Sequence, residues 1–127
     1  MNYQVLIVDD SKLARMSVAR LLSELRPAWR RLEASNADEA LGAVQASSVD
    51  MVLMDFNMPG RDGLVLAAEL RGLDPNMPLA LISANQQDEI VASAREIGVT
   101  FLSKPLTRDA LASFVEVAEA RLSTADR

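Results

Sequence analysis

The fold of this chain is decided by the stretch Met51-Val-Leu-Met-Asp-Phe-Asn-Met-Pro-Gly60. Four apolar residues run without a polar break and end at the carboxylate of Asp55, and the Pro-Gly pair behind it indicates a turn. A short apolar run bounded by a turn is typical of a strand buried on both faces of a sheet. Asp55 is therefore expected at the end of a central strand, which is the edge where open α/β sheets bind ligands.

Strands and helices are expected to alternate along the whole chain. Apolar and β-favouring runs predict strands at 5–8, 30–34, 51–55, 79–82 and 99–103. Helical spacing and capping residues predict helices at 12–25, 36–46, 64–72, 86–97 and from Thr107 to about Leu122. Gly63 is expected to supply a positive φ before the third helix, and Gly98 to end the fourth.

Alternation of this kind predicts parallel βαβ units with right-handed crossovers. The first, third and fourth strands are apolar and should be central, whereas the polar second and fifth strands should lie at the edges. The order 2-1-3-4-5, common among doubly wound folds, satisfies this pattern. We therefore expect an α/β fold, with a doubly wound five-stranded parallel sheet and five helices in a flavodoxin-like three-layer sandwich.

The composition excludes several classes of function. The 127 residues suit a single domain over 1–127, with 123–127 expected as a short tail. Cysteine and histidine are absent, which excludes disulfides, thiolate or histidine metal sites, Ser-His-Asp catalysis and a histidine phosphocarrier. The net charge of −5 argues against nucleic acid or an anionic membrane as partner. Neither a signal peptide nor a membrane-spanning run is evident, so a cytoplasmic protein is expected.

In the expected sheet, the carboxyl ends of four strands meet at one rim. They carry Asp9 and Asp10, Asp55, Ser83 and Lys104. Carboxylates brought close together repel unless a cation joins them, and a set of oxygen ligands selects a hard divalent ion such as Mg²⁺. Lys104 adds a positive charge for an anion, and a carboxylate can itself attack a phosphoryl group. The rim therefore suits phosphoryl chemistry better than a carbonyl substrate.

Each of these residues also has a simpler structural interpretation. The acidic pair could begin a turn or favour a helix N-terminus, Ser83 could cap a turn, and Lys104 could be a solvated loop charge. Phe101, taken alone, would be a core residue. The coincidence of acids, hydroxyl and amine on one rim favours the functional interpretation.

These residues resemble the receiver domain of two-component response regulators, of the stand-alone, chemotaxis-like type. The motifs follow family order and spacing over essentially the whole chain: Asp9-Asp10, the segment 55–63, Ser83-Ala84 and Lys104-Pro105. The resemblance implies phosphorelay signal transduction, in which Asp55 takes a phosphoryl group from a histidine kinase or phosphotransfer protein. It implies no enzyme with a separate substrate, only a domain that catalyses its own phosphorylation and dephosphorylation.

The resemblance also implies a role for each neighbour of Asp55. Asp10, Asp55 and the backbone carbonyl of Asn57 would hold Mg²⁺, and Asp9 would contribute mainly through water. Lys104 would contact one phosphoryl oxygen. The bond between Lys104 and its proline is often cis in the family.

A conformational switch is implied as well. Ser83 would bond another phosphoryl oxygen and, by moving toward it, would leave space for Phe101 to turn inward. This change would alter the face made by the fourth helix, the fifth strand and the last helix, where a downstream protein partner is expected. Val117, off the core stripe of the last helix, could mark this surface or be a stray exposed valine. The chain is expected to be a monomer or a weak dimer.

Three other interpretations stay open. The chain could be a receiver domain cut from a hybrid kinase or a longer regulator. A haloacid-dehalogenase-like phosphatase also uses an aspartate at a strand end with Mg²⁺, but it needs a second acid where this chain has Asn57, and normally a cap region. A pseudo-receiver that acts without phosphorylation is the third, and the complete acidic set argues against it.

Overall fold

A computed structural model describes residues 2–58, 60 and 62–125 of the chain. Its strands are β1 (Gln4–Val8), β2 (Arg30–Ala34), β3 (Met51–Asp55), β4 (Leu79–Ser83) and β5 (Thr100–Ser103). Its helices are α1 (Lys12–Leu25), α2 (Ala37–Ala46), α3 (Gly63–Leu73), α4 (Asp88–Glu96) and α5 (Arg108–Ala125). The strands pair in parallel in the order β2-β1-β3-β4-β5, which confirms the predicted fold class.

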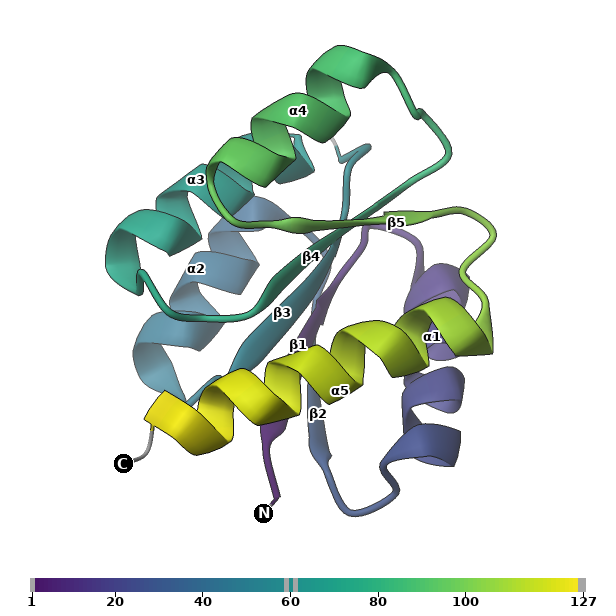
Figure 1. The fold of residues 1–127 in the computed structure, drawn as a ribbon, viewed down its shortest axis with the longest axis vertical. Helices are drawn as coiled ribbons and strands as arrows, with labels where there is room; N and C mark the ends of the chain where they lie inside the picture. The colour runs from purple at the N-terminus through teal and green to yellow at the C-terminus, as the bar shows by residue number, and fades with distance from the viewer. Residues whose placement is uncertain (1, 59, 61, 126–127) are drawn as a thin grey trace.

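Helices cover both faces of the sheet and make three layers. Figure 1 shows α1 and α5 on one side and α2, α3 and α4 on the other. Successive strand residues point to opposite faces, so Leu6 and Val8 pack under α2 and α3 whereas Val5 and Ile7 pack under α1 and α5. β3 and β4 are buried along their whole length, and this burial includes the polar residues Asp55 and Ser83 at their carboxyl ends.

Several helix boundaries depart from the prediction. The third helix begins one residue early, at Gly63, with the carboxylate of Asp62 accepting from the amide of Val65 at 2.9 Å as an N-cap. The fourth begins at Asp88 rather than 86. The last helix continues to Ala125, so the predicted tail is wrong over its first three residues, and residues 126–127 lie outside the described part.

The prediction for Gly63 is also wrong. In the described residues the glycines with positive φ are Gly60, at 83°, and Gly98, at 71°. Gly98 ends the α4 segment as predicted, and Gly60 supplies the turn after β3. Pro59, assigned to the same turn from the sequence, lies outside the described residues.

Candidate functional site

The carboxyl ends of four strands stop level with one another. Parallel register places Val8 beside Met54, Asp55 beside Ile82, and Ser83 beside Ser103. Backbone hydrogen bonds continue the ladders one residue further: the Phe56 amide donates to the Ile82 carbonyl at 3.0 Å, and the Lys104 amide donates to the Ser83 carbonyl at 3.0 Å. Side chains that follow these strands are therefore presented at a single rim.

Three carboxylates converge on this rim. Asp9, Asp10 and Asp55 each present an oxygen, and these oxygens lie within 4.8 Å of one another. Asp9 and Asp55 are buried, with 7% and 4% of their surface exposed, whereas Asp10 is open to solvent. Burial is the main reason that the pKa of Asp9 is raised, and the neighbouring charge of Asp55 acts in the same direction. The amide of Ser11, which donates to Asp9 Oδ1 at 2.9 Å, partly offsets this rise in pKa.

Lys104 supplies the positive charge at the rim. Its Nζ lies 2.6 Å from Asp55 Oδ1, and the peptide bond between Lys104 and Pro105 is cis, as expected. Asp55 Oδ1 is buried, and in the described part of the chain its partner is this ammonium. Among the described residues, three carboxylates lie close together and one ammonium, that of Lys104, contacts Asp55. This donor set fits a hard divalent ion such as Mg²⁺.

Ser83 and Phe101 lie beside the acids on β4 and β5. Ser83 is fully buried, and its Oγ accepts a hydrogen bond from the amide of Asn85 at 2.9 Å. Phe101 is half-buried against the core cluster under α2, α3 and α4 and pairs in register with Leu81. It lines a cleft of about 420 Å³ between α4 and β5. Both predicted switch residues are thus present, one on each of two paired strands.

Asn57 follows Asp55 by two residues in the loop and is exposed. Its predicted contribution, a backbone carbonyl toward a metal, stays a prediction. The loop ends at Gly63, whose backbone packs against the end of β3. A Cβ at this position would lie against the carbonyl oxygen of Asp55 and 2.7 Å from Leu81 Cδ1. Glycine at this position therefore lets the start of α3 approach the strand end that carries the central acid.

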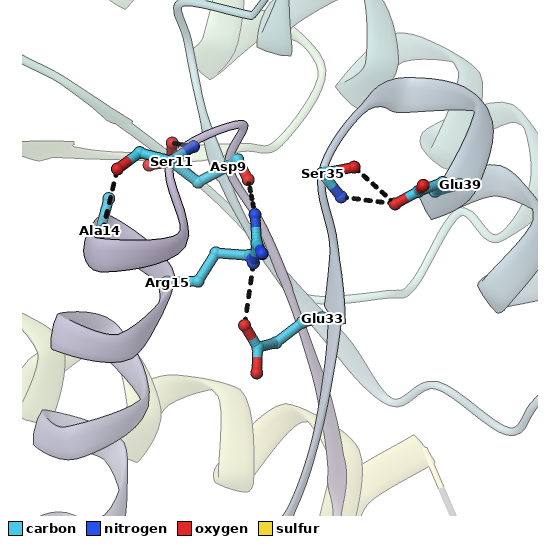
Figure 2. Close-up of polar contacts among 7 residues, drawn as sticks. All are labelled: Asp9, Ser11, Ala14, Arg15, Glu33, Ser35 and Glu39. Carbon is cyan, nitrogen blue, oxygen red and sulfur yellow. Dashed lines mark hydrogen bonds and ion pairs between the residues drawn. The ribbon is translucent and has the colours of Figure 1, made fainter.

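One part of the site was missed by reasoning from sequence. Figure 2 shows Arg15 of α1 extending to the carbonyl of Asp9 and to the carboxylate of Glu33 on β2. The signal in the sequence was a charged residue within an apolar-periodic helix, three residues before the buried Val18, and it was not read as part of the rim.

The family of the chain can now be stated from its geometry and its matches together. Residues 5–116 match the model of the response regulator receiver domain, a span that contains every rim residue described above. The chain belongs to this family. Receiver domains bind Mg²⁺ through acidic residues and interact with histidine kinases or phosphotransfer proteins, and this receiver domain carries a cluster of three acids, Asp9, Asp10 and Asp55.

Curated relatives of the receiver domain differ in length. It is 41% identical over 117 residues to the positive alginate biosynthesis regulatory protein of Pseudomonas aeruginosa, covering 90% of this chain and 46% of that protein. It is 29% identical over 119 residues to the sporulation initiation phosphotransferase F of Bacillus subtilis, covering 91% of this chain and 93% of the relative. The chain thus spans about half the length of the first relative and nearly all of the second.

Solved structures show the same fold. The chemotaxis protein CheY4 of Vibrio cholerae superposes with a TM-score of 0.83 at 24% identity, over 93% of this chain and 99% of that one. The receiver domain of an HD domain-containing protein from Pseudomonas fluorescens gives a TM-score of 0.86 at 26% identity, over 99% and 93% of the two chains. Among the described helices, none is long and apolar enough to cross a membrane.

Proposed function

We propose that this receiver domain is a Mg²⁺-dependent phosphoacceptor that takes a phosphoryl group on Asp55, with residues 1–127 acting as one domain. The observation that carries the proposal is the buried carboxylate of Asp55 at the end of β3, with Lys104 Nζ 2.6 Å from its Oδ1 and two further carboxylates within 4.8 Å. The fold alone supports many functions, whereas this set of groups suits phosphoryl transfer.

Transfer would proceed from the phosphohistidine of a kinase or phosphotransfer protein. An oxygen of Asp55 forms a bond to phosphorus while the bond between phosphorus and the donor imidazole nitrogen breaks, which gives an acyl phosphate and free histidine. Lys104, already beside Asp55, would neutralise one phosphoryl oxygen. Asp9, Asp10 and Asp55, with the carbonyl of Asn57, would hold Mg²⁺, which supplies charge stabilisation when bound.

A switch to a downstream protein would follow from the placement of Ser83 and Phe101. The Ser83 oxygen now accepts a hydrogen bond from the Asn85 amide, and its O–H would donate to a phosphoryl oxygen. Phe101 is only partly buried and borders the cleft at β5, so it has two environments available. The proposed partner surface is the face of α4, β5 and α5, where Val117 is 64% exposed. A phosphoryl group would bias this surface between two states.

Intact-mass spectrometry tests the proposal. The protein is incubated with Mg²⁺ and acetyl phosphate, and one labile phosphate adduct is expected. Asp55→Asn or EDTA should abolish it, whereas Asp109→Asn, which alters an exposed acid of α5, should leave it unchanged. An adduct that survives Asp55→Asn would contradict the proposal. Steady release of phosphate with turnover would instead favour the phosphatase.

A further inference from the structure

Arg15 joins the acidic turn to two elements at once. The side chain starts from α1, and its Nη1 donates to the backbone carbonyl of Asp9 at 2.6 Å. Its Nε donates to Glu33 Oε1, on the edge strand β2, at 2.8 Å. Only 15% of the Arg15 side chain is exposed, against 48% of Glu33. Figure 2 shows the guanidinium between the turn and the strand.

The carbonyl that Arg15 holds belongs to the peptide unit between Asp9 and Asp10. Because that unit is planar, fixing its oxygen also fixes the direction in which the backbone enters Asp10. On the N-terminal side of Asp9, its amide donates to the Ala34 carbonyl at 3.1 Å, and on the C-terminal side its Oδ1 accepts from the Ser11 amide at 2.9 Å. Arg15 therefore adds a second constraint on the C-terminal side of Asp9, beside the contact from Ser11, and the exposed Asp10 carboxylate lies in the turn between them.

Glu33 determines where the guanidinium lies. Arginine has a planar fork of donors, and using Nε for the carboxylate directs Nη1 of the same plane toward Asp9. Within the described part of the chain, the hydrogen bonds of Arg15 go to the Asp9 carbonyl and to Glu33 rather than to a carboxylate of the rim. We infer that Arg15, oriented by Glu33, is a positioning residue that sets divalent-cation affinity by fixing the turn that carries Asp9 and Asp10.

This inference rests on the proposed Mg²⁺ site, so Mg²⁺ affinity is measured directly, without phosphorylation. Arg15→Met is compared with wild type by calorimetric titration with MgCl₂, and Arg20→Met, an exposed arginine on the same helix, is the matched control. Residues that orient metal ligands typically contribute 10-fold or more to affinity, so we expect Mg²⁺ binding by Arg15→Met to weaken by about tenfold. Arg20→Met should bind as wild type does.

Two milder variants separate positioning from simple structural support. Arg15→Lys keeps the charge but loses the fork, so it should fall between wild type and Arg15→Met. Glu33→Gln keeps an acceptor for Arg15 Nε but removes the charge of the ion pair. It should weaken Mg²⁺ binding by about twofold to threefold, which is the size of effect that exposed ion pairs usually have. The free energy of unfolding of every variant is also measured in EDTA. A loss of Mg²⁺ affinity can then be distinguished from a loss of stability. If Arg15→Met does not fold, Arg15→Lys and Glu33→Gln decide the result.

The outcomes are distinguishable. Loss of stability in EDTA with Mg²⁺ affinity unchanged in Arg15→Met and Arg15→Lys would overturn the positioning role and leave the Mg²⁺ site standing. Wild-type protein that binds no Mg²⁺ would overturn both the site and this inference. Weaker binding in the Arg15 variants and unchanged binding in Arg20→Met would support it.

Discussion

At the start of α3, Gly63 lies against the backbone of Asp55, and this single missing side chain allows the loop after β3 to close. A Cβ here would press on the Asp55 carbonyl oxygen, on the Asp55 carbonyl carbon at 3.0 Å and on Leu81 Cδ1 at 2.7 Å. Two of these three atoms belong to the backbone of a central strand, which cannot shift alone. The residue was identified from the sequence as a turn glycine, but the reason for it, space rather than a positive φ, is visible only in three dimensions.

Gly63→Ala is therefore expected to destabilise the protein by about 1–3 kcal/mol, as overpacking of a filled interior does. Denaturation in urea measures the effect. Gly42→Ala is the control, because a Cβ at that exposed helical position meets nothing within 4 Å and should stabilise α2 by about 0.5–1 kcal/mol. Equal stability of wild type and Gly63→Ala would show that the close approach has no energetic consequence.

The raised pKa of Asp9 predicts how the stability of the protein changes with pH. Its pKa is raised above the ordinary value of 3.8 by burial and by Asp55, so the folded state binds more protons than the unfolded state in this range. Stability should then fall as pH rises from about 3.8 through the raised pKa, and the cost persists at neutral pH. In EDTA, Asp9→Asn should be more stable than wild type at pH 7 and should lose this part of the pH dependence. Urea denaturation from pH 3.5 to 7 measures it, and a less stable Asp9→Asn in EDTA would contradict the account.

At the scale of elements, a bidentate ion pair joins α1 to α5, beside a longer pair between Arg108 and Glu24 at 3.3 Å. Arg26, the C-cap residue of α1, donates through Nε and Nη2 to the two carboxylate oxygens of Glu119 on α5, at 3.0 and 2.6 Å. The hydrogen bonds from Arg26 are the main reason that the pKa of Glu119 is lowered from 4.5. For an acid with a lowered folded-state pKa, the stabilisation is present above 4.5 and is lost as pH falls through the lowered pKa.

Glu119→Gln should accordingly cost about 0.5 kcal/mol of stability at pH 7, a modest value because both side chains are partly exposed. The difference from wild type should shrink as pH falls below 4.5. Thermal unfolding across this range measures it. Glu116→Gln, an exposed residue one turn earlier on α5, serves as control and should show a smaller effect. A Glu119→Gln difference that stays constant down to low pH would refute the assignment.

Element boundaries show what periodicity could not predict. The fourth helix was expected from 86, yet the Gln87 amide donates to Asn85 Oδ1 at 3.2 Å, and this side-chain turn competes with the first turn of a helix. The Gln86 side chain donates to Ser103 Oγ at 3.0 Å, which draws it toward β5 instead. Both hydrogen bonds form only in the folded loop, so the spacing of apolar residues in the sequence could not predict them.

For the whole molecule, the sheet order and the gathering of rim residues followed from hydrophobicity, because buried central strands and polar edge strands leave few arrangements. The meeting of Asp9, Asp10, Asp55 and Lys104 was predictable for the same reason: parallel strands present their ends on one side. Arg15 was not predictable, since its role depends on a bond to a backbone carbonyl and on a strand partner eighteen residues away in the sequence.

The central claim is that Asp55, and no neighbouring acid, is the phosphoacceptor. The most direct measurement is to phosphorylate the protein with acetyl phosphate and Mg²⁺, reduce it with borohydride, and map the peptides by mass spectrometry. Reduction turns an aspartyl phosphate into homoserine. We predict homoserine at position 55, and none in a sample incubated with acetyl phosphate in EDTA. Homoserine at position 9 or 10 instead, with Asp55 unmodified, would contradict it.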